Sequence, residues 1–237
     1  MESTGYTTLT RQAGLMREMR VIANNIANAA TTGYRQEALI FSEFVMPVDQ
    51  GESISMATAR IQSTSQLQGA MTRTRGQFDL AIEGGGFFLV QSPEGPALTR
   101  NGAFSPSANG DLVTLDGDPV LDQGGAPIFI PPDASDLAVS QDGTLSTECR
   151  PLAQIAVVQP VDSLDLDRQA GVMFQAPAGF DPVEAPRVRQ GFLEGSNVDP
   201  VGQIARMIEV QRAYEMGQSF LDAENDRVRN ALKTFIR

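Results

Sequence analysis

The 237-residue sequence contains no histidine, no tryptophan, one lysine and one cysteine. The lack of histidine excludes His-based catalytic triads, His general bases and His-ligated zinc. The lysine, Lys233, lies near the C-terminus on a predicted helix, which argues against a Schiff-base enzyme. One cysteine, Cys149, excludes an internal disulfide. Catalysis would have to depend on carboxylates alone, and we expect no enzymatic activity, no cofactor and no bound metal.

Long apolar runs are also missing. No stretch approaches the roughly 18 apolar residues that a membrane span needs, so we expect no membrane insertion. No charged segment followed by an apolar one opens the chain, so no cleaved secretory signal is visible. The net charge of −11 argues against a nucleic-acid partner.

The N-terminal region carries a helical apolar stripe. Leu15, Met19, Ile22, Ile26 and Ala29 are spaced by steps of four and three residues, which is typical of a coiled-coil seam. This spacing predicts one helix over residues 6–32. The glycine at position 33 is expected to form a left-handed C-cap directly after it.

The C-terminal region predicts a second helix with a similar stripe. Asp199 and Pro200 form an N-cap followed by proline at the first helical position. The helix is expected to run about 35 residues, roughly 50 Å, which is long for a globular protein and favours a coiled coil. Its seam comprises Met207, Val210, Tyr214, Gly217, Leu221, Glu224, Val228, Ala231 and Phe235, widened by Ile204 and Ile208.

The middle of the chain has a different pattern. Four hairpin-type pairs occur, at residues 101–102, 109–110, 116–117 and 142–143. Apolar, strand-like segments occur at residues 87–90, 112–115, 128–130 and 155–158. Residues 75–190 are therefore predicted to be an antiparallel β-domain. The two ends are nearly neutral, at +1 for residues 1–40 and 0 for residues 199–237, so the middle carries the acidic excess.

These patterns predict a mixed α and β fold, with N- and C-terminal coiled-coil-forming helices flanking a central antiparallel β-rich domain. The expected divisions are an N-terminal helical segment (1–41), an extended and poorly ordered linker (42–75), the β-rich domain (76–190) and a C-terminal motif with the long helix (191–237). Two isolated helices would each bury only one stripe, which predicts an assembly whose core several copies build. Ordinary core helices of one globular domain are the alternative.

Three further motifs have simpler structural explanations. Glu83 and three following glycines lack the lysine and the helix of a phosphate-binding loop, so we predict a tight turn into a buried strand. The acidic cluster at residues 109–122 lacks EF-hand spacing and is explained by turns. Asp79 and Glu83 are candidates for the paired carboxylates of glycoside cleavage, but no aromatic sugar platform accompanies them.

Three asparagines, Asn24, Asn25 and Asn28, interrupt the first predicted helix. Asparagine is a poor helix-interior residue, because its amide competes for backbone hydrogen bonds. Their spacing places them on one side of the helix, beside the apolar seam. They either fix register and partner in an assembly or form the solvated back face of the helix.

Residues 24–35, Asn-Asn-Ile-Ala-Asn-Ala-Ala-Thr-Thr-Gly-Tyr-Arg, resemble the N-terminal signature of the flagellar axial proteins of rod and hook. Residues 79–88, 98–104 and 110–114 resemble that family's β-domain. Residues 193–199, Leu-Glu-Gly-Ser-Asn-Val-Asp, are similar to its C-terminal signature. The family often has phenylalanine and lysine where Tyr34 and Arg35 stand. The β-region has no large insert, which argues against hook proteins, and residues 5–8 resemble the start of proximal rather than distal rod proteins.

This resemblance implies a structural subunit of the flagellar basal-body rod that transmits motor torque toward the hook. It implies export through the flagellar type III apparatus, helical stacking in the periplasm, and partners that are copies of itself and other rod subunits. The expected subunit-assembly residues are Leu15, Met19, Ile22, Asn24, Asn25, Ile26, Asn28, Gly33, Ile204, Ile208, Val210, Tyr214, Leu221 and Val228. A secreted β-domain that binds a ligand is the rival hypothesis, although such a module would not need the two terminal stripes.

Overall fold

A computed structural model describes residues 2–46, 54–132, 134, 136–147, 150–169 and 171–235. The chain forms two compact units. The helical unit contains Met1–Ala27, Glu37–Ser63 and Asp199–Arg237, and the β unit contains Asn28–Gln36 and Thr64–Val198. The chain therefore passes between the units four times. Two helices flank a β-rich antiparallel region, as expected, although residues 28–36 and 191–198 belong to the β unit.

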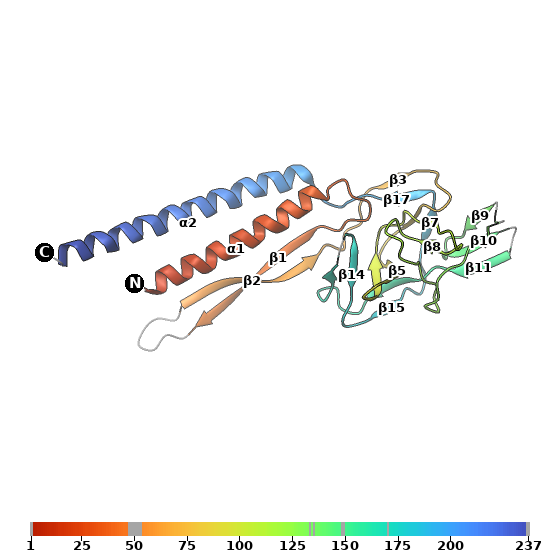
Figure 1. Cartoon of the computed structure of the whole chain (residues 1–237), viewed down its shortest axis with the longest axis horizontal. Helices are drawn as coiled ribbons and strands as arrows, with labels where there is room; N and C mark the ends of the chain where they lie inside the picture. The colour runs from red at the N-terminus through yellow and green to blue at the C-terminus, as the bar shows by residue number, and fades with distance from the viewer. Residues whose placement is uncertain are drawn as a thin grey trace. The chain divides into compact units, whose positions relative to one another are not determined.

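In the helical unit, α1 (Glu2–Ala27) and α2 (Pro200–Phe235) lie side by side and run in opposite directions (Figure 1). A two-stranded sheet of β1 (Glu37–Met46) and β2 (Ile54–Thr64) accompanies them, and β1 contacts α1. These strands occupy much of the segment that was expected to be an extended linker. Its poor ordering was a prediction that partly concerns residues 47–53, which lie outside the described part of the chain.

The second helix begins and runs as predicted. The carboxylate of Asp199 accepts a hydrogen bond from the N–H of Val201, and its carbonyl accepts one from Gln203. The first helix differs from the prediction, because it ends at Ala27 rather than near residue 32. Asn28 closes a separate turn there: its carbonyl and its side-chain oxygen both accept hydrogen bonds from Thr31. The local side-chain bond competes with helix continuation.

The β unit is built from short antiparallel strands. Its largest sheet has six strands in the order β13-β14-β6-β5-β12-β15. Smaller sheets pair β3 with β17, β4 with β16, β7 with β8, and β9, β10 and β11 with one another. The strand bounds are β3 Met71–Arg73, β4 Leu80–Ile82, β5 Phe87–Ser92, β6 Gly95–Thr99, β7 Ser105–Pro106, β8 Leu112–Val113, β9 Leu137–Val139, β10 Thr144–Thr147, β11 Arg150–Gln154, β12 Val157–Pro160, β13 Asp167–Arg168, β14 Met173–Gln175, β15 Phe180–Pro182, β16 Val188–Gln190 and β17 Phe192–Glu194.

Strand β5 separates two apolar cores. Phe88 and Val90 belong to one core, with Leu80, Leu112 and Ile155, whereas the alternate residues Phe87 and Leu89 belong to the other, with Leu98 and Phe174. Because successive side chains of a strand point to opposite faces, a strand between two cores is apolar throughout. This explains the continuous apolar run of residues 87–90.

Three of the four predicted hairpin turns connect paired segments. Gly110, Gly117 and Gly143 have positive φ angles of 90°, 93° and 85°, and antiparallel pairs flank each of them. The pair Asn101-Gly102 is not such a hairpin. A Cβ at Gly102 would lie 1.7 Å from the carbonyl oxygen of Leu80, so this glycine allows two backbone segments to approach each other. The turn at residues 83–86 leads into buried β5, as predicted.

Candidate assembly site and its supporting contacts

The predicted seams of the two helices face each other within one chain. Ile22 and Val210 are buried, and Leu15, Met19, Ile26, Tyr214 and Leu221 are half-buried. The seam of α2 thus packs in its own helical unit. Whether the same residues also contact other subunits stays a prediction.

Polar contacts fix the alignment of the two helices. The amide of Gln12 donates a hydrogen bond to the carbonyl of Tyr214 over 2.8 Å. Arg206 forms an ion pair with Glu18 at 2.7 Å. A Cβ at Gly217 would lie 2.2 Å from Nε2 of Gln12, so the glycine leaves room for that side chain. Gln12 was not predicted from the sequence; the interruption of the apolar seam at Gly217 was the available signal.

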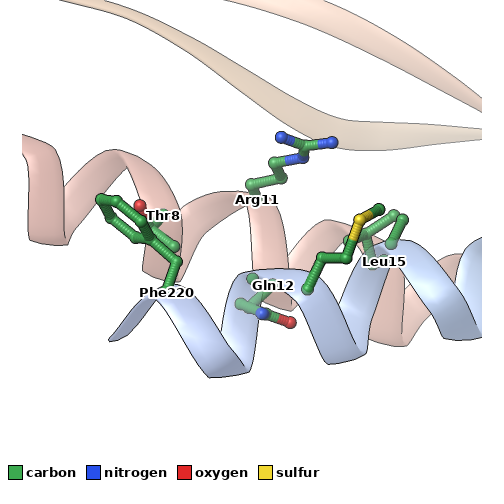
Figure 2. A pocket seen from close by; sticks show the side chains of 8 residues that line it. Thr8, Arg11, Gln12, Leu15 and Phe220 are labelled. Carbon is green, nitrogen blue, oxygen red and sulfur yellow. The ribbon is translucent and has the colours of Figure 1, made fainter. Parts of the chain in front are cut away.

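A groove of about 390 Å³ lies between the two helices (Figure 2). It is largely apolar, but it contains the side chain of Gln12, whose Oε1 is buried and has no hydrogen-bond partner among the described residues. The residues lining this interhelical groove are Thr8, Arg11, Gln12, Leu15, Ala213, Met216, Gly217 and Phe220.

Other predicted assembly residues are exposed. Ile204 and Ile208 lie near the start of α2, Val228 lies near its end, and Asn24 lies on α1. More than half of the exposed large apolar side chains in the described residues are on the two helices, namely Leu9, Met16, Val201, Ile204, Ile208, Met216, Phe220 and Val228. Exposed apolar side chains are therefore concentrated on the two helices, and such concentrations are a common mark of interaction sites.

The asparagines have three different environments. Asn25 is buried, and its side chain accepts a hydrogen bond from the N–H of Glu37 (3.0 Å) and donates one to the carbonyl of Glu37 (2.8 Å). The amide of Asn25 also contacts Gln203 of α2. Asn24 is exposed, and Asn28 forms the turn after α1. The expectation that all three lie on one side of a helix is therefore wrong, because the helix ends before Asn28, and the solvated-face alternative does not hold for Asn25.

Within the β unit, residues 28–36 contact strand β17. The N–H of Gly33 donates to the carbonyl of Glu194 over 2.7 Å. Gly33 has a φ of 70°, as predicted, although it does not directly follow the helix. A Cβ there would lie 2.3 Å from the backbone nitrogen of Asn101. Both the angle and the close approach therefore require glycine.

The next two residues are held by charge. The guanidinium of Arg168 lies 4.4 Å from the ring centre of Tyr34 and 4.5 Å from that of Phe174. Such cation–π contacts explain why an aromatic residue at position 34 is useful. Arg35 and Arg100 both pair with Glu194, each at 3.2 Å, and all three side chains are almost completely buried. We call these three residues the buried charge cluster.

Burial sets the energetics of the buried charge cluster. Desolvation lowers the pKa of Arg100 to about 10, against the opposing effect of Glu194, and it also lowers the pKa of Arg35. A pKa of about 10 keeps the Arg100 guanidinium charged at neutral pH. Two buried cations thus share one carboxylate, and the Nε atoms of both arginines have no hydrogen-bond partner in the described part of the chain. The cluster therefore depends strongly on Glu194.

Asn197 connects two other segments of the β unit, around residues 36 and 65–67. Its side chain accepts a hydrogen bond from the N–H of Gln36 (2.6 Å) and donates to the hydroxyl of Ser65 (3.2 Å) and the carbonyl of Leu67 (2.7 Å). The N–H of Ser65 also bonds the carbonyl of Gln36. Residues 36, 65 and 197 lie close to three of the points where the chain passes from one unit to the other. Within the β unit they are thus joined by direct hydrogen bonds.

The carboxylates of acidic turn residues accept hydrogen bonds from within their own turns, which explains their presence. The carboxylate of Asp122 accepts hydrogen bonds from the N–H groups of Gly124 and Ala126, and that of Asp142 accepts one from Thr144. Within the described residues, no group of three or more potential metal-ligating acidic or cysteine side chains occurs, and no helix has the length and apolar character to cross a membrane.

Comparison with known proteins gives three family matches along the chain. Residues 5–35 match the model for flagella basal body rod proteins. Residues 81–147 match the D1 domain of the flagellar hook proteins FlgE/F/G, and residues 189–234 match the C-terminal part of the flagellar basal body rod FlgEFG proteins. These matches include both signatures noted in the sequence.

Individual relatives match most or nearly all of the chain. The flagellar basal-body rod protein FlgF of Caulobacter vibrioides is 37% identical, with 98% of each chain covered. FlgF of Mesorhizobium japonicum is 32% identical, covering 99% of this chain and 98% of its own. The rod protein FlgG of Agrobacterium fabrum is 30% identical, covering 88% and 90%.

Proposed function

Because the chain belongs to the flagellar basal-body rod protein family, as its two signatures predicted, we propose that it is a structural subunit of the rod that assembles helically through its terminal helices. Its similarity to proteins named FlgF favours that type over FlgG. In this role it transmits motor torque toward the hook. The names of its relatives describe rod proteins rather than enzymes, which agrees with a structural role.

The observation that carries the proposal is the concentration of exposed apolar side chains on α1 and α2. Each helix buries one face against the other and leaves further apolar residues, among them Leu9, Met16, Ile204 and Met216, in contact with solvent. An isolated subunit gains nothing from this exposure, whereas neighbouring subunits can cover it. The terminal helices are therefore the surfaces through which copies and other rod subunits join.

The buried charge cluster and Asn197 support the torque-transmitting role. Torque that enters one unit must pass through the chain segments that connect it to the other. Residues 33–36, 65–67 and 194–197 hold one another by direct hydrogen bonds and buried ion pairs. Such contacts stiffen the β-unit side of the connection.

Export and location complete the proposal. We propose export in an unfolded state through the flagellar type III apparatus, without signal cleavage, followed by folding and assembly in the periplasmic span of the rod. The described fold suits this order, because Glu194 joins Arg35 and Arg100 only after nearly the whole chain is available.

Deletion of the gene, followed by electron microscopy of purified basal bodies, tests the function. We expect basal bodies without a complete rod and hook, and cells without motility. A plasmid copy of the unmodified gene should restore both. Complete rods in the deletion strain would contradict the proposal.

A further inference from the structure

Helix α2 carries a second stripe on the side away from its packed seam. Val201, Ile204 and Ile208 are 77%, 50% and 46% exposed. Their spacing of three and four residues places them on one face of the helix. We call them the apolar ridge. The same spacing continues with Gln211 and Glu215, which hydrogen-bond each other over 3.0 Å.

We propose that the apolar ridge of one subunit docks into the interhelical groove of a second copy of this chain. This inference rests on the proposed rod function and names the residues that join neighbouring copies. The groove volume of about 390 Å³ falls in the range of pockets that enclose small ligands, roughly 300–1,000 Å³, so it accommodates aliphatic side chains such as those of the ridge.

The ridge and the groove also complement each other in polar character. Arg11 lines the groove and has no acidic partner in the described part of the chain, whereas Glu215 lies in line with the ridge.

The position of the two patches determines the kind of assembly. Residue 204 of the ridge and residue 217 of the groove are separated by roughly 20 Å along α2, at 1.5 Å per residue. A chain cannot fill its own groove with its own ridge at that separation. Contacts between two different patches are heterologous and continue from copy to copy, which generates open helical assemblies rather than closed dimers.

The small size of the contact also favours an extended assembly over an isolated dimer. A stable dimer buries about 800 Å² on each partner. Three aliphatic side chains and two polar ones supply much less than that, so one ridge-to-groove contact does not hold a pair together. The contact becomes effective where each copy has several neighbours, as in a rod.

Disulfide trapping in cells tests the proposal. A strain deleted for the gene receives the full chain with Cys149→Ser, Ile204→Cys and Met216→Cys. If ridge and groove meet between copies, oxidation should yield a ladder of dimers, trimers and larger products. The matched control replaces Met216→Cys by Gln218→Cys, an exposed position on the same helix turn but on its other side, and should give no ladder.

Each outcome has a distinct meaning. Dimers without higher products, equal ladders in test and control, products with another rod protein in place of a second copy, or no product in cells with intact rods would each overturn the proposal. The last result would leave the proposed function standing, because motility and rod assembly report on that function separately.

A charge exchange provides an independent test. Arg11→Glu in the test background should lower the yield of the ladder about tenfold, and the added Glu215→Arg should restore it. Leu164→Ser alters an apolar residue of the β unit that is about as exposed as Ile204, and it should leave the yield of the ladder unchanged. A loss that Glu215→Arg does not restore would contradict the pairing of groove and ridge.

Discussion

Glu194 pairs with two guanidinium groups that lie inside the β unit. At the scale of single residues, this contact links the two family signatures. Arg35 belongs to the N-terminal signature and Glu194 to the C-terminal one. Burial of an ion pair contributes little by itself, but the loss of one partner leaves an unpaired charge in a dry environment.

Glu194→Gln should therefore lower the free energy of unfolding of the β unit by about 3–5 kcal/mol, because the amide keeps the shape but not the charge. Urea denaturation measures this change. The matched control is Glu83→Gln, which breaks the exposed pair with Arg189 and should cost less than about 1 kcal/mol. Equal costs for the two variants would contradict the importance of the buried charge cluster.

Gly33 and Gly171 both have a φ of 70°. Comparing them therefore distinguishes two reasons for glycine at position 33, the left-handed conformation and the close approach of another backbone segment. In Gly171→Ala the new Cβ has no other atom within 4 Å. The substitution should therefore lower the free energy of unfolding only by the cost of a left-handed conformation, about 1–2 kcal/mol. Gly33→Ala must also displace the backbone of Arg100 and Asn101, which should add about 1–3 kcal/mol. Thermal unfolding of both variants measures the difference, and identical midpoints would refute the close-approach explanation.

At the scale of secondary-structure elements, the helix faces could be predicted and the links between elements could not. The seam of α2 follows from steps of three and four residues, and Asp199 marks the start of the helix. In contrast, the partner of Asn25 lies twelve residues away in a strand, and Arg168 comes from a segment without any helical or alternating pattern. Contacts across such separations leave no local periodic signal, so helical spacing alone wrongly predicts that the asparagines form one surface.

The side chain of Asn25 connects α1 to the backbone of Glu37 in β1. Asn25→Leu removes both hydrogen bonds between the Asn25 side chain and the backbone of Glu37, so we expect a loss of about 1–3 kcal/mol in local stability. Hydrogen exchange at the amide of Glu37 should become faster, while exchange in β5 should not change. Asn24→Leu, at an exposed neighbouring position, is the control and should leave the Glu37 amide protected. Unchanged exchange in the Asn25 variant would show that this link is dispensable.

At the scale of the whole molecule, sequence and structure divide the chain in different ways. Charge and periodicity place residues 1–41 and 191–237 with the helices, whereas the structure assigns residues 28–36 and 191–198 to the β unit. Composition could not reveal this, because these two segments are short and near neutral. Their position depends on specific partners, such as Glu194 and Asn197, rather than on average polarity.

This division predicts an order of tryptic cleavage in the purified chain. Arg212 and Arg229 lie exposed on a helix held mainly by one seam, so they should be cut early. Arg35 should be cut late, although it is close to the N-terminus, because it is buried and paired with Glu194. Glu194→Gln should accelerate cleavage after Arg35 by at least about a hundredfold, since cleavage follows the population of the opened state. Mass spectrometry of timed digests resolves these sites, with Glu83→Gln as the control. Cleavage after Arg35 as fast as after Arg212 in the unmodified chain would show that residues 28–36 do not belong to the stable β unit.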